Sequence, residues 1–394
     1  MTNDEIIALN TRYQFPLYTR APMALVRGQG CRVWDADGKE YLDFFASTVV
    51  TALGHTHPGV TRAIVEQAGK ILHVSNLHHS EPQAILAELL CTHSFADRVF
   101  LCNSGAEANE AAIKLARKHG ADHGDGRFEI VTALGSFHGR TIATITATGQ
   151  EKVRHGFQPL PEGFRYAPFN DADALAAAIT PRTIAVMLEP VQGEGGIAVP
   201  SPDYLRRVRE ICDQRGLLLI FDEVQTGMGR LGTLFGYQQS GIAPDIMTLA
   251  KGLGTGVPIG AMLATERFAA TFTAGAHAST FGGNALTCAV GVAVMRAMLN
   301  DGVLENCRAQ GEYLRQRLRA LQASCPRIRD VRGLGLLVGA ELDGPGAAVV
   351  EACRVAGLLI NCTAEKVLRF SPPLIVTRAE VDAAMAIVEK ILRQ

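Results

Sequence analysis

Leu218-Leu219-Ile220-Phe221-Asp222-Glu223 and Ile246-Met247-Thr248-Leu249-Ala250-Lys251 are two short apolar runs, and each ends in ionisable residues. Runs of this length that are rich in Leu and Ile predict strands buried on both faces of a sheet. A lysine delivered by such a strand is costly to keep charged, so we expect the pKa of Lys251 to be lowered. Its neutral amine would be a nucleophile able to form a Schiff base with a carbonyl compound.

Between about residue 83 and residue 265, short apolar runs of this kind recur along the chain. Apolar runs alternate with helical patterns such as Ala106–His119 and Asp203–Arg215, the second of which follows Pro202 and stops at Gly216. This pattern predicts a large α/β domain with a mostly parallel central sheet. The predicted strands, all interpreted as buried and parallel, are 98–102, 128–133, 183–189, 217–222, 246–250 and 259–264.

The two ends of the chain show a different pattern of predicted helices and strands. Residues 24–45 predict a β-hairpin with strands Gly30–Trp34 and Glu40–Phe44. Helical patterns at 284–299 and 303–322 precede short strands near 328–342, 357–361 and 367–371 and a last helix near 378–392. We therefore expect an N-terminal segment, 1–50, that joins a small α+β domain, a large domain, 51–283, and the C-terminal part of the small domain, 284–394.

Composition excludes several classes of partner. The chain has 394 residues and a net charge of −1, which gives no electrostatic reason to expect nucleic acid or an anionic membrane. No apolar run reaches the roughly 18 residues of a membrane span, and the acidic start lacks the pattern of a signal peptide. Nine cysteines without a CxxC pair indicate neither a zinc site nor a disulfide framework. We therefore expect that the protein has no metal site and that it is located in the cytoplasm.

Lys251 and Asp222 together suggest a cofactor. A buried lysine and a buried aspartate, each at the exit of its own strand, are the two polar contacts that the ring of pyridoxal 5′-phosphate (PLP) requires. The lysine would hold the aldehyde carbon, and the carboxylate would pair with the protonated ring nitrogen. Taken alone, a lysine after a strand is more often a solvated loop residue, and such an aspartate more often belongs to a turn or a helix cap.

Two further strand exits carry residues suited to the same ligand. Ser104-Gly105-Ala106 opens a helix, where free N–H groups and the helix dipole favour a phosphate. Capping by Ser104 is the simpler interpretation, but it leaves Gly105 unexplained. Phe137 could stack on a planar ring, and Arg140 could bind a substrate carboxylate. The alternative interpretation is that Phe137 is a packed core residue and Arg140 a surface residue. We assign no role to His138, which we interpret as a loop histidine.

Glu189 and Glu194 follow another predicted strand. Paired carboxylates occur in glycosidases, but that interpretation leaves the lysine and the phosphate site unexplained. A carboxylate that pairs with a mobile arginine fits better. Because ligands of parallel α/β sheets bind at the carboxyl ends of the strands, the convergence of these sites favours one cofactor pocket.

These motifs resemble those of the class III PLP-dependent aminotransferases. The resemblance covers nearly the whole chain and implies PLP-transferase fold type I. Within the class, Ala106–Arg117 and Leu359–Thr363 are most similar to the acetylornithine group of arginine biosynthesis. The motifs that carry the resemblance are Asn103–Glu110, Phe137–Thr141, Glu189–Glu194, Phe221–Gly227, Lys251, Thr280–Asn284 and Leu368–Leu374.

The resemblance implies a role for each matching residue. Lys251 binds the cofactor and shuttles a proton, Asp222 keeps the ring nitrogen protonated, and Gln225 bonds the ring oxygen. A homodimer with shared active sites is implied, since Thr280 reaches the phosphate bound by the partner subunit. The implied cofactor-binding set is Ser104, Gly105, Ala106, Phe137, Asp222, Glu223, Val224, Gln225, Lys251 and Thr280, and the substrate-binding set is Arg140, Glu194, Ser279 and Arg369.

The implied reaction transfers the amine of N2-acetyl-L-ornithine to 2-oxoglutarate, giving N-acetyl-L-glutamate 5-semialdehyde and L-glutamate. Arg140 would bind the α-carboxylate of the donor, and Arg369 that of 2-oxoglutarate, with Glu194 screening Arg369 in between. The stretch Ser47–His55 lacks the tyrosine found here in ornithine aminotransferases, which favours an acylated amine. Succinylornithine, ornithine, 4-aminobutyrate and a lysine-pathway amine stay open as donors. An isomerase of the same fold and a non-catalytic ligand sensor are the competing classes.

Overall fold

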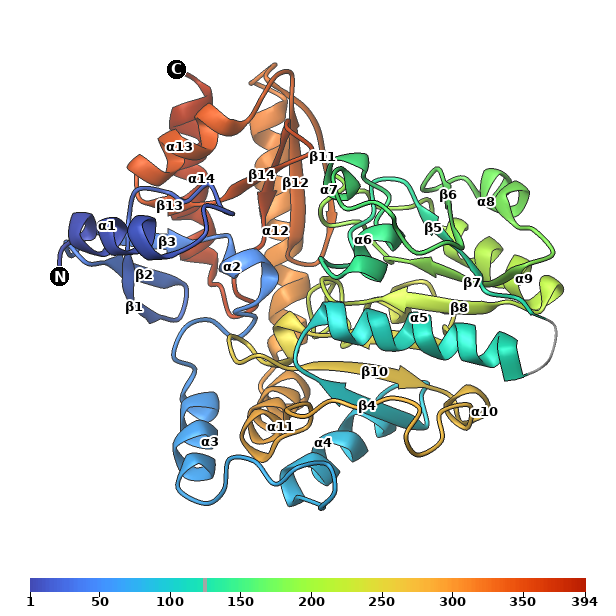
Figure 1. The fold of residues 1–394 in the computed structure, drawn as a ribbon. Helices are drawn as coiled ribbons and strands as arrows, with labels where there is room; N and C mark the ends of the chain where they lie inside the picture. Colours follow the sequence, from blue (N-terminus) through green and yellow to red (C-terminus); the bar gives the residue numbers. More distant parts are fainter. Residues whose placement is uncertain (123–125) are drawn as a thin grey trace.

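A seven-stranded sheet forms the centre of the protein in the computed structural model, which describes residues 1–122 and 126–394 (Figure 1). Its strands are β4 (Arg98–Cys102), β5 (Glu129–Ala133), β6 (Phe164–Ala167), β7 (Thr183–Leu188), β8 (Leu218–Asp222), β9 (Ile246–Leu249) and β10 (Gly260–Ala264). They lie in the order β4-β10-β9-β8-β7-β5-β6. The neighbours from β9 to β6 are all parallel, so the expected mostly parallel α/β sheet is confirmed.

Strand β10 corrects one expectation. The apolar run at 259–264 is not parallel to its neighbours, because β10 pairs antiparallel with both β4 and β9. The connection from β9, residues 250–259, contains only the short 3₁₀ helix η2 (Lys251–Leu253). A parallel neighbour needs a crossover of about a dozen residues or more, so this short connection can only reverse the chain.

Two four-stranded sheets are built from the ends of the chain. The first contains β1 (Leu25–Gln29), β2 (Arg32–Asp35), β3 (Glu40–Asp43) and β13 (Leu358–Leu359). The second contains β11 (Ile328–Leu334), β12 (Leu337–Leu342), β14 (Asn361–Thr363) and β15 (Val367–Phe370). The expected hairpin is present as β2 and β3, and β13 pairs with β3 in parallel, so both ends of the chain share one sheet (Figure 1). The domain boundaries after residues 50 and 283 stay a prediction.

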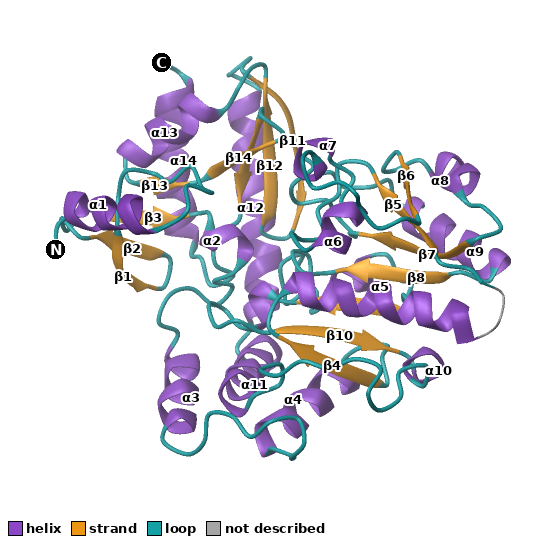
Figure 2. Ribbon diagram, in the orientation of Figure 1, coloured by secondary structure: helices purple, strands orange, loops and turns teal. Residues whose placement is uncertain are grey.

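Helix α5 packs along the central sheet, whereas α12 and α14 pack together beside β11 and β12 (Figure 2). Capping explains several helix starts: α14 begins with a capping box between Thr377 and Glu380. The five helices expected from the sequence, α5, α9, α11, α12 and α14, are confirmed to within three residues at each end. The helices are α1 (Asn3–Tyr13), α2 (Ala46–Val49), α3 (Pro58–Ala68), α4 (Glu81–Thr92), α5 (Gly105–Asp122), α6 (Ile142–Ala147), α7 (Glu151–Arg154), α8 (Ala172–Ala178), α9 (Tyr204–Arg215), η1 (Gly236–Gln239), α10 (Glu266–Ala269), α11 (Ala285–Asn300), α12 (Val303–Gln322), α13 (Ala347–Val355) and α14 (Arg378–Leu392).

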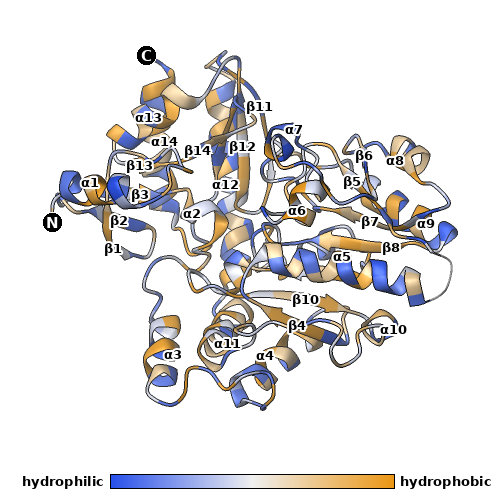
Figure 3. Cartoon of the chain, viewed as in Figure 1, coloured by the Kyte–Doolittle hydropathy of each residue, from blue (hydrophilic) through white to orange (hydrophobic). Residues whose placement is uncertain are grey.

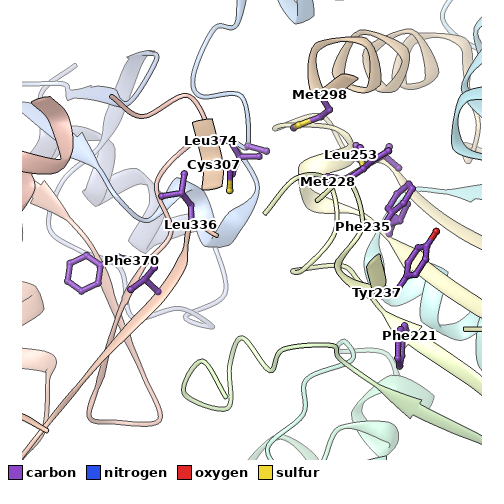
Figure 4. Close-up of a cluster of buried hydrophobic side chains, with 14 of the residues drawn as sticks. Phe221, Met228, Phe235, Tyr237, Leu253, Met298, Cys307, Leu336, Phe370 and Leu374 are labelled. Carbon is purple, nitrogen blue, oxygen red and sulfur yellow. The ribbon is translucent and has the colours of Figure 1, made fainter. Parts of the chain in front are cut away.

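One apolar cluster links the central sheet to the C-terminal sheet. Figure 4 shows Phe221 and Phe235 on one side of it and Leu336 and Phe370 on the other, and all four are buried. The strands of the central sheet are coloured hydrophobic in Figure 3, as expected for strands covered on both faces. A cavity forms at the carboxyl ends of β4, β5, β7, β8 and β9, where the loops that follow these strands meet.

Within the described residues, no single helix has the length and apolar composition of a membrane span. Helices α11 and α12 meet that test only when they are taken together, and they are bent by 67° at their junction.

Candidate active site

Lys251 lies just beyond the carboxyl end of β9, at the start of η2. Its backbone is left-handed, with φ 43°, a conformation that costs a non-glycine residue about 1 to 2 kcal/mol. The Lys251 carbonyl accepts hydrogen bonds from Gly254 N and Thr255 N, which close the turn. Burial lowers the pKa of the Lys251 amine to about 8, against the opposing charge of Glu194. The decrease in pKa expected from the sequence is therefore present.

Asp222, the last residue of β8, is held by three hydrogen bonds. Its Oδ2 accepts from Asn109 Nδ2 at 2.7 Å and lies 2.8 Å from His138 Nδ1, while its Oδ1 accepts from Val224 N at 3.0 Å. Asn109 is itself fixed by Thr248 Oγ1, which donates to Asn109 Oδ1 at 2.7 Å. Asp222 is only 3% exposed, so a charge there needs these donors. Contacts from three separate elements fix the orientation of this carboxylate.

The start of α5 approaches the loop after β8 closely. A Cβ atom on Gly105 would lie 2.8 Å from a methyl carbon of Val224, so only glycine permits this contact. Ser104 Oγ accepts from Glu107 N at 3.2 Å, so the capping interpretation of Ser104 also applies. The first N–H groups of a helix have no partner within the helix, and with the helix dipole they favour an anion in front of Gly105 and Ala106.

Phe137 and Arg140 lie on the loop after β5. Phe137 N donates to Glu189 Oε2 at 3.1 Å, and the guanidinium carbon of Arg140 lies 5.4 Å from the centre of the Phe137 ring. Burial, reinforced by the charge of Asp222, holds the pKa of Glu189 well above its ordinary value. The loop therefore offers an aromatic ring and an exposed cation next to a buried carboxyl group whose pKa is raised.

These side chains line one cavity of about 410 Å³. Val50, Asn103, Asn109, His138 and Glu189 also contribute to its wall. The predicted site residues that the structure brings together here are Ser104, Gly105, Ala106, Phe137, Arg140, Asp222, Val224, Gln225 and Lys251.

Arg369 and Glu194 form an ion pair beside this cavity. Arg369 Nη1 lies 2.6 Å from Glu194 Oε1, and Gln225 Nε2 donates to the same oxygen at 3.3 Å. Arg369 Nε donates to Asn361 Oδ1 at 2.9 Å, which holds the guanidinium from its other side. Burial would raise the pKa of Glu194, but the charge of Arg369 prevails and lowers it. The Arg369 side chain is 1% exposed and that of Glu194 29%, so the carboxylate is the accessible member of the pair.

Besides Arg369 and Glu194, three more predicted residues lie outside the cavity lining. Glu223 is buried, and its carboxylate accepts from Gly236 N and Tyr237 N instead of facing the cavity. Ser279 and Thr280 line a separate surface cavity of about 800 Å³. Ser279 Oγ nevertheless accepts from Asn103 Nδ2 at 3.1 Å, which connects the two cavities.

Asn109 and His138 are the functional candidates that the sequence did not reveal. Asn109 stands on a helix face with the small residues Ala108, Ala111 and Ala112, and this polar residue in an apolar face is the one available signal. His138 is buried, and its Nε2 has no hydrogen-bond partner in the described part of the chain. Within residues 1–122 and 126–394, no group of three or more potential ligands could hold a metal ion.

Comparison with known proteins agrees with this geometry. Residues 15–392 match the family described as Aminotransferase class-III, so the chain belongs to the class III aminotransferases, which are PLP-dependent enzymes. The chain is 50% identical to the acetylornithine aminotransferase of Caldanaerobacter subterraneus, with 99% of both chains covered. It is similar to the solved N-acetylornithine aminotransferase of Stenotrophomonas maltophilia, with 40% identity, TM-score 0.85 and 98% of both chains covered.

A second solved relative contains the cofactor. The ornithine aminotransferase of Toxoplasma gondii, described with partial occupancy of PLP at its active site, is 33% identical with a TM-score of 0.96, and the match covers 100% of this chain and 94% of that one. The residues of the 410 Å³ cavity fit this cofactor. They supply an amine with a lowered pKa, a fixed carboxylate, an aromatic ring and the start of a helix, and Gly105 leaves the space that a side chain would fill.

Proposed function

We propose that this aminotransferase transfers the δ-amine of N2-acetyl-L-ornithine to 2-oxoglutarate and so serves arginine biosynthesis. The observation that carries the proposal is the pair of arginines, Arg140 at the cavity and Arg369 buried beside it behind Glu194. Arginine binds carboxylates through a two-pronged fork, and two such positions suit a donor and an acceptor that are both carboxylates. The names of the two acetylornithine relatives support the choice of donor.

The chain's own residues divide the work of binding. Lys251 Nζ would hold the aldehyde carbon of PLP, and the N–H groups of Gly105 and Ala106 would bind its phosphate. Phe137 and Val224 would pack on opposite faces of the ring, with Gln225 near its oxygen. When bound, PLP supplies an electron-withdrawing ring that acidifies the C–H bond next to the transferred amine.

Proton transfer falls to Asp222 and Lys251. The Asp222 carboxylate would hold a proton on the ring nitrogen, and its contacts with Asn109 and His138 keep it in one orientation. Lys251 Nζ would then move the proton from the δ-carbon of the donor, since an amine with a pKa of about 8 exchanges protons readily near neutral pH. In the second half-reaction the same groups would act in reverse, with the acceptor's carboxylate on Arg369.

The lining of the cavity supports an acylated donor. Val50, which comes from the stretch without a tyrosine, is an apolar wall residue. An apolar wall penalises a free α-ammonium group more than an acetylated one. Succinylornithine, ornithine, 4-aminobutyrate and a lysine-pathway amine are the competing donors.

We also propose a homodimer in which Thr280 and Ser279 complete the partner's site. Leu77, Leu72 and Phe281 are 88%, 51% and 63% exposed, and Leu77 lines the same surface cavity as Thr280. Large apolar side chains gathered on a surface are typical of an interface. All nine cysteines are free thiols, which supports a reducing compartment and hence the cytoplasm.

A donor panel tests the function. PLP-loaded protein is incubated with 2-oxoglutarate and each of the five amines, and glutamate formation is measured. We expect the highest kcat/KM with N2-acetylornithine. A higher value with a free diamine or with 4-aminobutyrate would overturn the proposed donor. Turnover that needs no 2-oxo acid would indicate an isomerase instead.

A further inference from the structure

The loop that carries Glu194 is anchored at its base. Gln192 and Ala198 exchange backbone hydrogen bonds of 3.1 and 3.0 Å across this loop. Inside it, the Ile197 side chain is fully buried in an apolar cluster with Leu337 and Val367 of the C-terminal sheet. The base of the loop is therefore closed by this isolated bridge, and Ile197, next to the base, packs on β12 and β15.

Side chains of the C-terminal sheet also bind the carbonyl groups of this loop. Thr363 Oγ1, at the end of β14, donates to the Glu194 carbonyl. Arg332, on β11, donates through Nη2 to the Gly196 carbonyl at 2.7 Å and through Nε to the Ile197 carbonyl at 3.2 Å. Thr363 is 5% exposed, so its hydrogen bond is shielded from water. These contacts hold the backbone of Glu194 in place independently of its side chain.

The carboxylate of Glu194 has more freedom than its backbone. Its partner Arg369 is buried and held by Asn361, whereas the Glu194 side chain is 29% exposed. If the backbone is fixed and Arg369 cannot move, the pair can open only by rotation of the Glu194 side chain. A dicarboxylate that binds Arg369 must displace this carboxylate, so its affinity depends on how firmly the pair is closed.

We propose that Thr363 and Arg332 are positioning residues that fix the backbone of Glu194 and thereby set the competition between its carboxylate and a dicarboxylate substrate for Arg369. The proposal rests on the proposed function, because it takes the acceptor to be 2-oxoglutarate. Loosening the loop weakens the closed pair and makes Arg369 easier to reach. One hydrogen bond of ordinary net strength corresponds to a change of roughly threefold to tenfold in such an equilibrium.

The test uses glutarate, a dicarboxylate without the reactive carbonyl, as an inhibitor competing with 2-oxoglutarate on the PLP-loaded enzyme. We expect Thr363→Val to lower the inhibition constant about threefold. Thr363→Ser, which keeps the hydroxyl, should behave as the parent protein. The matched control is Thr146→Val on helix α6, since the Thr146 hydroxyl donates to the Ile142 carbonyl at 2.7 Å and Thr146 is also 5% exposed.

A double-mutant comparison separates positioning from general damage. In a Glu194→Ala background the competing carboxylate is gone, so Thr363→Val should leave the glutarate constant unchanged. The proposal would be overturned if Thr363→Val changed the glutarate inhibition constant equally in both backgrounds. It would also be overturned if Thr363→Val weakened glutarate binding or left it unchanged in the parent background. Arg332→Gln, which removes the contacts to Gly196 and Ile197, repeats the test if the valine variant does not fold.

Hydrogen exchange gives a readout that needs neither substrate nor cofactor. Amide exchange of a peptide covering residues 190–199 should be faster in Thr363→Val than in the parent protein and normal in Thr363→Ser. Unchanged exchange would contradict the proposed role of Thr363. If the parent protein fails to bind glutarate, the proposed acceptor is wrong, and the exchange comparison still decides whether Thr363 positions the loop.

Discussion

His138 Nδ1 lies 2.8 Å from Asp222 Oδ2, and both side chains are shielded from solvent. Asn109 Nδ2 donates to the same oxygen, so this edge of the carboxylate is occupied by two donors. The carboxylate that faces the cavity is therefore fixed in orientation, which is what a partner for a protonated ring nitrogen requires.

Replacing Asp222 by Asn tests this partnership. The substitution keeps the shape but removes the charge, and loss of one member of a buried ion pair costs about 3 to 5 kcal/mol. We expect kcat to fall at least about 100-fold. The matched control is Asp245→Asn, just before β9, whose carboxylate accepts from Arg209 and Leu219 N away from the cavity. A comparable loss of kcat in both variants would contradict the proposed pairing of Asp222 with the ring nitrogen.

The Lys251 amine should titrate near pH 8 in the cofactor-free protein, because burial lowers its pKa to about 8. The protonated form predominates below this pH, so the rate of reaction with added PLP should rise with pH and level off above it. The neutral fraction of such an amine is about tenfold larger at pH 9 than at pH 7. Stopped-flow absorbance across this range measures the rate. A flat profile would contradict a titrating amine at this position.

The two arginines should affect different half-reactions. Arg369→Lys loses the planar fork, so we expect the KM for 2-oxoglutarate to rise about tenfold or more while the KM for the amino donor changes little. Arg140→Lys should produce the opposite pattern. Initial rates with each substrate varied in turn provide the measurement, and each variant is the control for the other. An equal rise of both KM values in both variants would contradict the hypothesis that the two arginines bind different substrates.

Glu223 should make stability depend on pH, since burial raises its pKa to about 7 even though Gly236 N and Tyr237 N favour the charged form. Between about pH 4.5 and 7 the folded protein keeps a proton that the unfolded chain has lost, so the stability contributed by this group falls as pH rises. Glu223→Gln cannot ionise but loses an acceptor for one buried N–H, at a cost of about 1 to 3 kcal/mol.

Melting temperatures at pH 5.5 and pH 8 measure this effect. We expect Glu223→Gln to be less stable than the parent protein at pH 5.5, with a smaller difference at pH 8. The exposed Glu88→Gln variant is the control and should show no difference at either pH. A difference of equal size at pH 5.5 and pH 8 would mean that Glu223 is charged throughout this range and would contradict a raised pKa.

The proposed dimer should depend on Leu77, which is 88% exposed and lines the same surface cavity as Thr280. A charge in an apolar interface is costly, so Leu77→Glu should shift the protein towards monomer and weaken PLP retention. Val355→Glu, at a 59% exposed position on α13, is the control. Analytical ultracentrifugation gives the mass of each variant. A stable dimer of Leu77→Glu would exclude this face as the interface.

Patterns within short segments predicted much of the fold. Six of the seven central strands were recognisable because each is a short run of mainly apolar residues, and α14 was expected from the helical pattern near 378–392. Strand β6 escaped prediction because Phe164-Arg165-Tyr166-Ala167 is short, mixed in polarity and at the sheet edge. The direction of β10 is set by its short connection to β9, which the apolar run itself does not reveal.

The candidate site was predictable only in part, for a related reason. Lys251 and Asp222 stand out because a charge directly follows an apolar strand. Asn109 and His138 are separated from Asp222 by 113 and 84 residues in the sequence, so their hydrogen bonds depend on how the elements pack. The opposite case is Glu223, which lies next to Asp222 in sequence while its carboxylate accepts from the amides at the start of η1.

Attachment of the cofactor to Lys251 is tested most directly by borohydride reduction of the PLP-loaded protein, followed by digestion and mass spectrometry. The account predicts a phosphopyridoxyl group on the peptide that contains Lys251, and none on that peptide when the residue is replaced by Ala. A reduced protein without an adduct, or with the adduct on a different lysine, would contradict it.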